Sequence, residues 1–138
     1  MTLTTTLASV PPVILVHAAF AFAALATGPV AFTARKGSTL HRLMGYVWIS
    51  LMLATALSSF FIRDFRLPNT AGYTPIHLLS VAALLGLGFG VWFIVQRRIL
   101  AHRRVMRATY VSLVVAGLLT LAPKRLFGGM LVQALGLA

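Results

Sequence analysis

The sequence predicts an all-α membrane protein, a bundle of four transmembrane helices made of two repeated hairpins, in which residues 1–138 form one integral membrane domain. Mean hydropathy is +0.94 and only 9% of the residues are charged, which is not a soluble composition. The apolar residues occur in runs of about 20, the length that crosses a bilayer as a helix. Basic residues are concentrated between these runs, mainly in 35–45 and 96–107.

Turn-forming residues divide the chain into the expected elements. Gly28-Pro29 should bend the first helix, because proline removes a backbone donor. Ser38 or Thr39 should cap the second helix, and Thr74-Pro75 should begin the third. The segment 126–138 is apolar but too short to span, so we expect it at the membrane interface or against the bundle. The four helices are expected at about 11–34, 40–62, 74–96 and 100–121.

The basic residues also predict the orientation of the chain in the membrane. Eight of the twelve lie in the first and third turns and four on the other side. Because cytoplasmic loops carry the excess of Lys and Arg, we expect a multi-pass protein of the bacterial inner membrane with both termini in the periplasm. The net charge of +11 lies at the ends of apolar runs. It therefore indicates membrane lipids, or an anionic group bound at the rim, and not nucleic acid as the partner.

The sequence excludes several kinds of chemistry. It has no cysteine, so disulfides, thiolate metal sites and thiol nucleophiles are absent. Asp64 is the only acidic residue, which argues against carboxylate-pair catalysis and acidic proton relays. No residue is therefore predicted to be catalytic.

Four histidines, one in each expected helix, reveal an internal repeat. His41 follows His17 by 24 residues, and His102 follows His77 by 25. Arg42 follows His41 directly, as Arg103 follows His102. Gly28 and Gly88 each lie eleven residues beyond a histidine, close to three whole turns, and therefore on that histidine's helix face. These matches predict two parallel hairpins related by an axis along the membrane normal.

The repeat places two histidines in each leaflet. With short turns, the first helix lies diagonal to the third and the second to the fourth. His17 and His77 would then face each other in the outer leaflet, and His41 and His102 in the inner one. Two neutral imidazoles on opposed helices suit the axial positions of a b-type haem. We therefore predict two b haems, with Gly28, Gly45 and Gly88 giving room for the macrocycle and Arg42 and Arg103 binding propionates.

Four strings of residues also carry a resemblance to a known family. They are H-R-L-M-G-Y-V from His41, L-M-L-A-T-A-L-S-S-F from Leu51, Y-T-P-I-H-L-L-S from Tyr73 and A-H-R-R-V-M from Ala101. Together they resemble the bacterial membrane proteins grouped as domain of unknown function 2306, over most of the chain from His17 onward. That family has no settled activity. Its layout is similar to that of four-helix di-haem cytochrome b proteins, which by analogy implies haem binding.

The leading functional prediction is a membrane electron carrier, a di-haem b-type cytochrome that exchanges electrons with a quinone or a partner redox protein. The first alternative is a non-redox accessory or scaffold subunit of a larger membrane complex, in which the histidines serve packing and lipid contacts. The second alternative is a transition-metal carrier that uses the same histidines. It is the weakest, because the chain has a single acidic residue, no cysteine and no methionine cluster.

Overall fold

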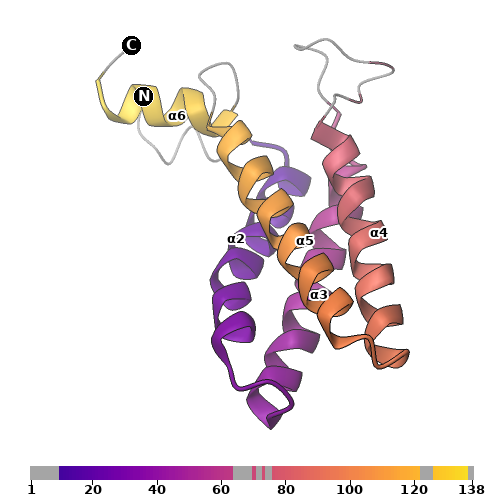
Figure 1. Cartoon of the computed structure of the whole chain (residues 1–138). Coiled ribbons are helices and arrows are strands. Elements are labelled where there is room, and N and C mark those ends of the chain that lie inside the picture. The colour runs from indigo at the N-terminus through magenta and orange to yellow at the C-terminus, as the bar shows by residue number, and fades with distance from the viewer. Residues whose placement is uncertain (1–9, 64–69, 71–72, 74–75, 122–125, 137–138) are drawn as a thin grey trace.

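The computed structural model describes residues 10–63, 70, 73, 76–121 and 126–136, and their regular structure is helical (Figure 1). Apart from the helices, an isolated β-bridge joins Thr70 and Tyr73. The all-α prediction is therefore confirmed for this part of the chain, and the four long helices begin and end within three residues of the expected bounds. The helices are α2 (Pro12–Thr33), α3 (Thr39–Ser59), α4 (Ile76–Val95), α5 (Ile99–Thr120) and α6 (Leu126–Ala134).

The beginnings of α2 and α3 follow from local chemistry. Pro12 occupies the first position of α2, where its missing N–H costs nothing. Ser38 caps α3, because its Oγ accepts the backbone N–H of His41 at 3.1 Å. The predicted start of the third helix at Thr74-Pro75 lies outside the described residues.

Helix α3 ends at Ser59, three residues before the expected end. The side chains of Ser58 and Ser59 donate to carbonyls of the preceding turn, at 3.0 and 2.7 Å. Beyond them, the N–H of Phe61 donates to Ser58 O and the N–H of Ile62 donates to Ser59 O. Each of these hydrogen bonds spans three residues, whereas those of an α-helix span four. The apolar run 60–62 therefore tightens into a turn, which hydropathy alone does not indicate.

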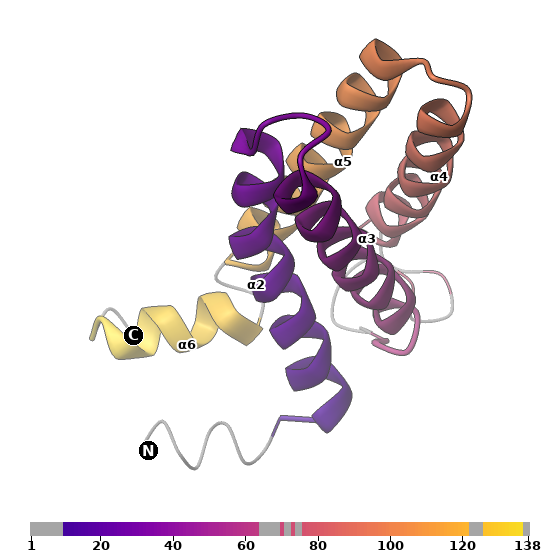
Figure 2. The same cartoon turned by 90° about the horizontal axis from the view of Figure 1, so that it is seen from below.

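The long helices form two hairpins that lie side by side (Figures 1 and 2). α2 packs along α3, and α4 along α5. The hairpins meet where α3 packs against α4 and, more lightly, where α2 packs against α5. Within the described residues the backbones of α2 and α4 do not come close to each other, nor do those of α3 and α5, so these pairs are the diagonals and meet only through side chains of the core. Both hairpin turns lie at the same end of the molecule, and α6 projects to the side at the opposite end (Figure 1).

The helices bury small and large apolar side chains in the centre and expose many others outward. Trp48 and Met52 are the largest fully buried side chains. Outward-facing residues include Leu78, which is 71% exposed, and Leu118, which is 63% exposed. Lipid would cover such a surface, because exposing apolar side chains to water costs free energy. The central cluster consists of Ala24, Trp48, Met52, Ala83, Leu87, Met106 and Leu113.

Three helices of the described chain are long and apolar enough to cross a membrane: Pro12–Thr33, Thr39–Ser59 and His77–Val95. α5 has a similar length of 22 residues, but Arg103, Arg104 and Arg107 lie in its first half. These charges make it less apolar than the other three helices. The membrane character predicted from composition is thus present in three helices, and α5 is the most polar of the four.

Candidate functional site

Each of the four histidines lies near a helix end. His41 and His102 belong to the first turns of α3 and α5, at the end that carries both hairpin turns. His77 lies in the first turn of α4 and His17 in the second turn of α2, at the opposite end. The sequence therefore predicted correctly which histidines share a level of the molecule.

His41 and His102 are held by the same kind of contact. The Nδ1 atom of His41 lies 2.9 Å from the carbonyl oxygen of Ala31 on α2. The Nδ1 atom of His102 lies 2.8 Å from the carbonyl oxygen of Gly90 on α4. In both cases the histidine of the second helix of a hairpin is fixed to the backbone of the first helix. The repeat seen in the sequence is thus reproduced in the hydrogen bonds.

These contacts define the tautomer of the two rings. A carbonyl oxygen can only accept, so Nδ1 must carry the proton in both His41 and His102. In the neutral ring, Nε2 then has a lone pair. A histidine that binds a metal through Nε2 almost always donates its other N–H to a carbonyl, a carboxylate or water. His41 and His102 therefore have the protonation and the support of metal-ligating imidazoles.

The surroundings of the predicted glycines differ from one position to the next. A Cβ atom added at Gly45, one turn above His41, would meet no atom within 4 Å, and the same holds for Gly88. A Cβ atom at Gly28 would lie 2.5 Å from the Tyr110 ring. Gly45 and Gly88 therefore border open space, whereas Gly28 serves helix packing.

The side chain of Tyr110, on α5, packs against α2 at Gly28 and Pro29. Pro29 has no N–H, so the carbonyl of Leu25 four residues earlier has no donor in its own helix. The hydroxyl of Tyr110 donates to this Leu25 oxygen at 3.1 Å. The Tyr110 ring also packs edge-on against Phe32, with ring centroids 5.3 Å apart. The dipeptide predicted to bend α2 thus forms a contact between α2 and α5, the smaller of the two places where the hairpins meet.

The packing glycines of the second hairpin are Gly86 and Gly90, which the sequence reading did not single out. A Cβ atom at Gly86 would overlap the Thr109 hydroxyl, and one at Gly90 would overlap the Met106 side chain. In the first hairpin, Gly28 similarly lies against Trp48. Counting eleven residues from a histidine selects Gly88, which is exposed. The signal that finds the close contacts is the G-x-x-x-G spacing of 86–90.

His17 and His77 both converge on the end of α3. Nδ1 of His17 lies 3.0 Å from the Ser58 hydroxyl, and that hydroxyl donates its own proton to Thr55 O. Nδ1 of His17 is therefore the donor. The two imidazoles lie within Coulombic range of each other.

His77 makes its hydrogen bonds to α3 through Nε2, whereas the contacts of the other three histidines involve Nδ1. Its Nε2 lies 3.1 Å from both Ser59 O and Ile62 O, so Nε2 carries the proton. Its ring packs edge-on against Tyr73, with centroids 5.1 Å apart. Serines also hydrogen-bond between helices here, with Ser59 Oγ 2.8 Å from Ser80 Oγ. The structure thus distinguishes the outer pair from the inner pair by its hydrogen bonds.

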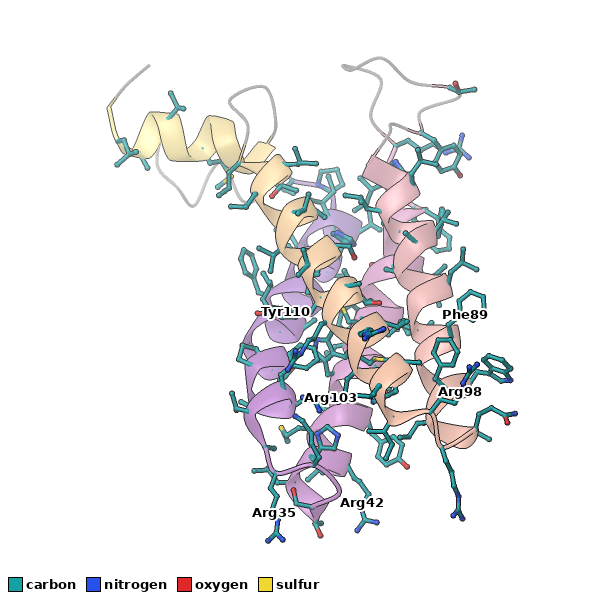
Figure 3. All side chains as sticks on the ribbon, viewed as in Figure 1. Arg35, Arg42, Phe89, Arg98, Arg103 and Tyr110 are labelled. Atoms are coloured by element: carbon teal, nitrogen blue, oxygen red, sulfur yellow. The ribbon has the colours of Figure 1, made fainter. Side chains whose placement is uncertain are left out.

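The two arginines that follow the inner histidines lie in different places. Arg42 extends below the ribbon at the end of the first hairpin, beside Arg35, whereas Arg103 lies higher, level with the lower parts of the helices (Figure 3). Arg103 is close enough to Lys36 in the α2–α3 turn to interact electrostatically. The repeat in sequence is therefore not matched by equivalent positions of these two cations.

Within the described ranges, no three side chains of His, Cys, Asp or Glu gather as ligands for a metal ion. A haem iron needs only two ligands from the protein, because the porphyrin supplies the other four.

Comparison with known proteins gives one result. The family model described as predicted membrane protein, DUF2306, matches residues 14–134. No curated protein and no solved structure matches the chain.

Proposed function

The chain belongs to the DUF2306 family of predicted membrane proteins, and in that setting we propose that it is a membrane electron carrier, a di-haem b-type cytochrome. His41 and His102 would be the axial ligands of one haem, and His17 and His77 those of a second. Bound haem would supply one-electron redox chemistry, with a membrane quinone or a redox protein as the partner.

The observation that carries this proposal is the pair of Nδ1 contacts at the inner histidines. Ala31 O and Gly90 O orient the rings of His41 and His102 and select the tautomer whose neutral form has its lone pair on Nε2. Two neutral imidazoles from different helices are the ligand set of a b-type haem. A histidine that ligates a metal through one ring nitrogen usually donates the N–H of the other in this way.

The helix arrangement supports the same ligand pair. α3 and α5 are diagonal, and their backbones do not come close to each other in the described residues, although the Trp48 and Tyr110 rings lie 6.3 Å apart between them. Helices in direct contact have axes about 8–10 Å apart, which leaves no room for a macrocycle between them. The open space at Gly45, one turn from His41, lies on that histidine's face of α3.

The chain's own residues would position the ligands of such a site and exclude water from it. The carbonyl contacts fix the orientation of the two rings. Met106, one turn above His102, is buried and would keep water from the ligand. Arg42 would offer its guanidinium group to a propionate at the rim.

The outer pair fits the same role less directly. His17 has the tautomer that leaves Nε2 as the acceptor, as in the inner pair. His77 donates from Nε2 to two carbonyls at the end of α3, so ligation through Nε2 would break both bonds. We therefore expect the inner haem to be held more firmly than the outer one.

We also propose that α5 is the fourth transmembrane helix and that both hairpin turns face the cytoplasm. Arg103, Arg104 and Arg107 lie in the first turns of α5, where long basic side chains can reach the headgroups. The eight-to-four distribution of basic residues favours this orientation and periplasmic termini. In this arrangement α6 would lie at the periplasmic interface.

Chemical rescue tests the inner ligands. In His102→Gly, free imidazole can enter the space beside Gly90 O, donate to the same carbonyl and offer its second nitrogen to iron. We expect the reduced-minus-oxidised haem spectrum to weaken in His102→Gly and to recover with imidazole. Arg104→Gly, two residues along α5, is the matched control and should keep its spectrum without imidazole. A His102→Gly spectrum equal to that of the wild type would refute the proposal.

A further inference from the structure

Three cations from different hairpins meet at the end of the molecule that carries the turns. Lys36 belongs to the α2–α3 turn, and Arg103 and Arg107 lie one helical turn apart on the same side of α5. We call these three residues the inner cation cluster. Partial burial of the ammonium, followed by the charges of Arg103 and Arg107, lowers the pKa of Lys36. The three groups therefore repel one another across the lightly packed contact between α2 and α5.

The residues that the structure describes include no aspartate or glutamate, so none of them can neutralise the cluster. An anion from outside this part of the chain would be needed to offset the three charges.

The three cations differ in the donors they can offer. The ammonium of Lys36 donates to Phe32 O and, at 3.3 Å, to Ala34 O, carbonyls at the end of α2. Lys36 therefore contributes mainly charge. Within the described part of the chain, no hydrogen bond or ion pair engages the guanidinium of Arg103 or Arg107. These two groups have donors available for an anion.

The surface beside the cluster is apolar and indicates the kind of anion. Val111 and Leu118 follow Arg107 by four and eleven residues, a spacing that keeps them on the same face of α5. Val111 is 57% exposed and Leu118 is 63% exposed. This face of α5 thus runs from two guanidinium groups into exposed apolar side chains. A ligand that matches it has an anionic head and an apolar tail.

We propose that Arg103 and Arg107, assisted by the charge of Lys36, bind the phosphate of an anionic phospholipid such as phosphatidylglycerol. Its acyl chain lies along Val111 and Leu118. Basic pockets between transmembrane helices recognise anionic lipid headgroups in this way. The bound phosphate offsets the repulsion between the hairpins and joins α5 to the α2–α3 turn. The site does not depend on haem.

Lipid titration of the delipidated full-length protein tests the proposal. Native mass spectrometry in a neutral detergent measures binding of phosphatidylglycerol and of phosphatidylcholine. We expect the wild type to prefer phosphatidylglycerol. Arg103→Gln/Arg107→Gln should bind it about 30-fold more weakly, about fivefold for each cation removed. Phosphatidylcholine binding should not change.

The matched control is Arg97→Gln/Arg104→Gln, which removes the same charge from the same end of the molecule but leaves the inner cation cluster intact. It should keep the lipid preference within about twofold. Because a double variant of α5 can misfold, Lys36→Gln provides a second test, with about a fivefold loss expected. Circular dichroism checks the fold of each variant.

Several results would overturn the proposal. One is equal binding of both lipids by the wild type, and another is an equal loss in the control. Displacement of the lipid by millimolar inorganic phosphate would indicate a site for a free anion. Haem content is measured on the same samples. Loss of haem with unchanged lipid preference would assign the arginines to propionates instead.

Discussion

Replacing Tyr110 by phenylalanine tests the hydrogen bond that joins α5 of the second hairpin to α2 of the first. The change removes only the hydroxyl that donates to Leu25 O at 3.1 Å. The phenylalanine ring keeps its packing against Gly28 and Phe32. Any loss of stability then reports the hydrogen bond and not the apolar contact.

The expected loss follows from Pro29. Hydrogen bonds between transmembrane helices contribute about 0.6 kcal/mol on average and about 1.7 kcal/mol at most. The hydrogen bond to Leu25 O should contribute a free energy in the upper part of this range. Pro29 provides no N–H, so without Tyr110 the carbonyl would have no partner. We expect Tyr110→Phe to lower the free energy of unfolding by about 1–1.5 kcal/mol. In a Pro29→Ala background, the new alanine restores the backbone donor and the loss should fall to about 0.5 kcal/mol.

The assay is unfolding in mixed detergent micelles, followed by circular dichroism and by the fluorescence of the buried Trp48. Tyr46→Phe is the matched control, because Tyr46 is 71% exposed and should lose nothing measurable. Equal stability of Tyr110→Phe and Tyr46→Phe would refute the reasoning. An unchanged cost of Tyr110→Phe in the Pro29→Ala background would refute the role of proline.

Three further predictions concern helix packing, a helix cap and topology. Gly28→Ala places a methyl group 2.5 Å from the Tyr110 ring and should lower the free energy of unfolding by about 1–3 kcal/mol, whereas Gly88→Ala meets no atom within 4 Å and should cost nothing in the same assay. Ser38→Ala removes the cap of α3 and should cost about 1 kcal/mol, with Ser50→Ala, at an exposed position within α3, as the control; equal stabilities would argue against the cap. A reporter that is active only in the cytoplasm should remain silent when fused after Ala138, and activity there would reverse the proposed orientation.

The sequence was sufficient for the helices and for the levels of the histidines. Long apolar runs, the serine cap at Ser38 and the basic turns each depend on chemistry within a few residues. The same local reading failed at the end of α3, because the serine side chains and a change of hydrogen-bond spacing end the helix inside an apolar run. Local pattern therefore predicts where a helix exists better than where it stops.

The details of the site depend on contacts between helices that no spacing in one helix reveals. Gly28 and Gly88 occupy equivalent positions relative to the histidines in the sequence, yet only at Gly28 does a side chain from another helix pack against the glycine. Arg42 and Arg103 are equivalent as neighbours of histidines, yet only Arg103 lies beside Lys36. The carbonyl partners of His41 and His102 were also unforeseen, because backbone carbonyls carry no sequence signal. These contacts arise from the way α5 crosses α2 and from the way each hairpin closes.

The proposal that this protein binds two b haems is tested most simply by the haem content per mole of purified protein. It is measured as the pyridine haemochrome after expression in a haem-replete host. We expect two haems in the wild type. His41→Ala, His102→Ala and the double variant should each retain one, because two ligands of the same iron act as a unit and their losses do not add. A wild-type ratio of one that falls to zero in these variants would confine the site to His41 and His102. A wild type without haem, or a double variant with the wild-type ratio, would contradict the account.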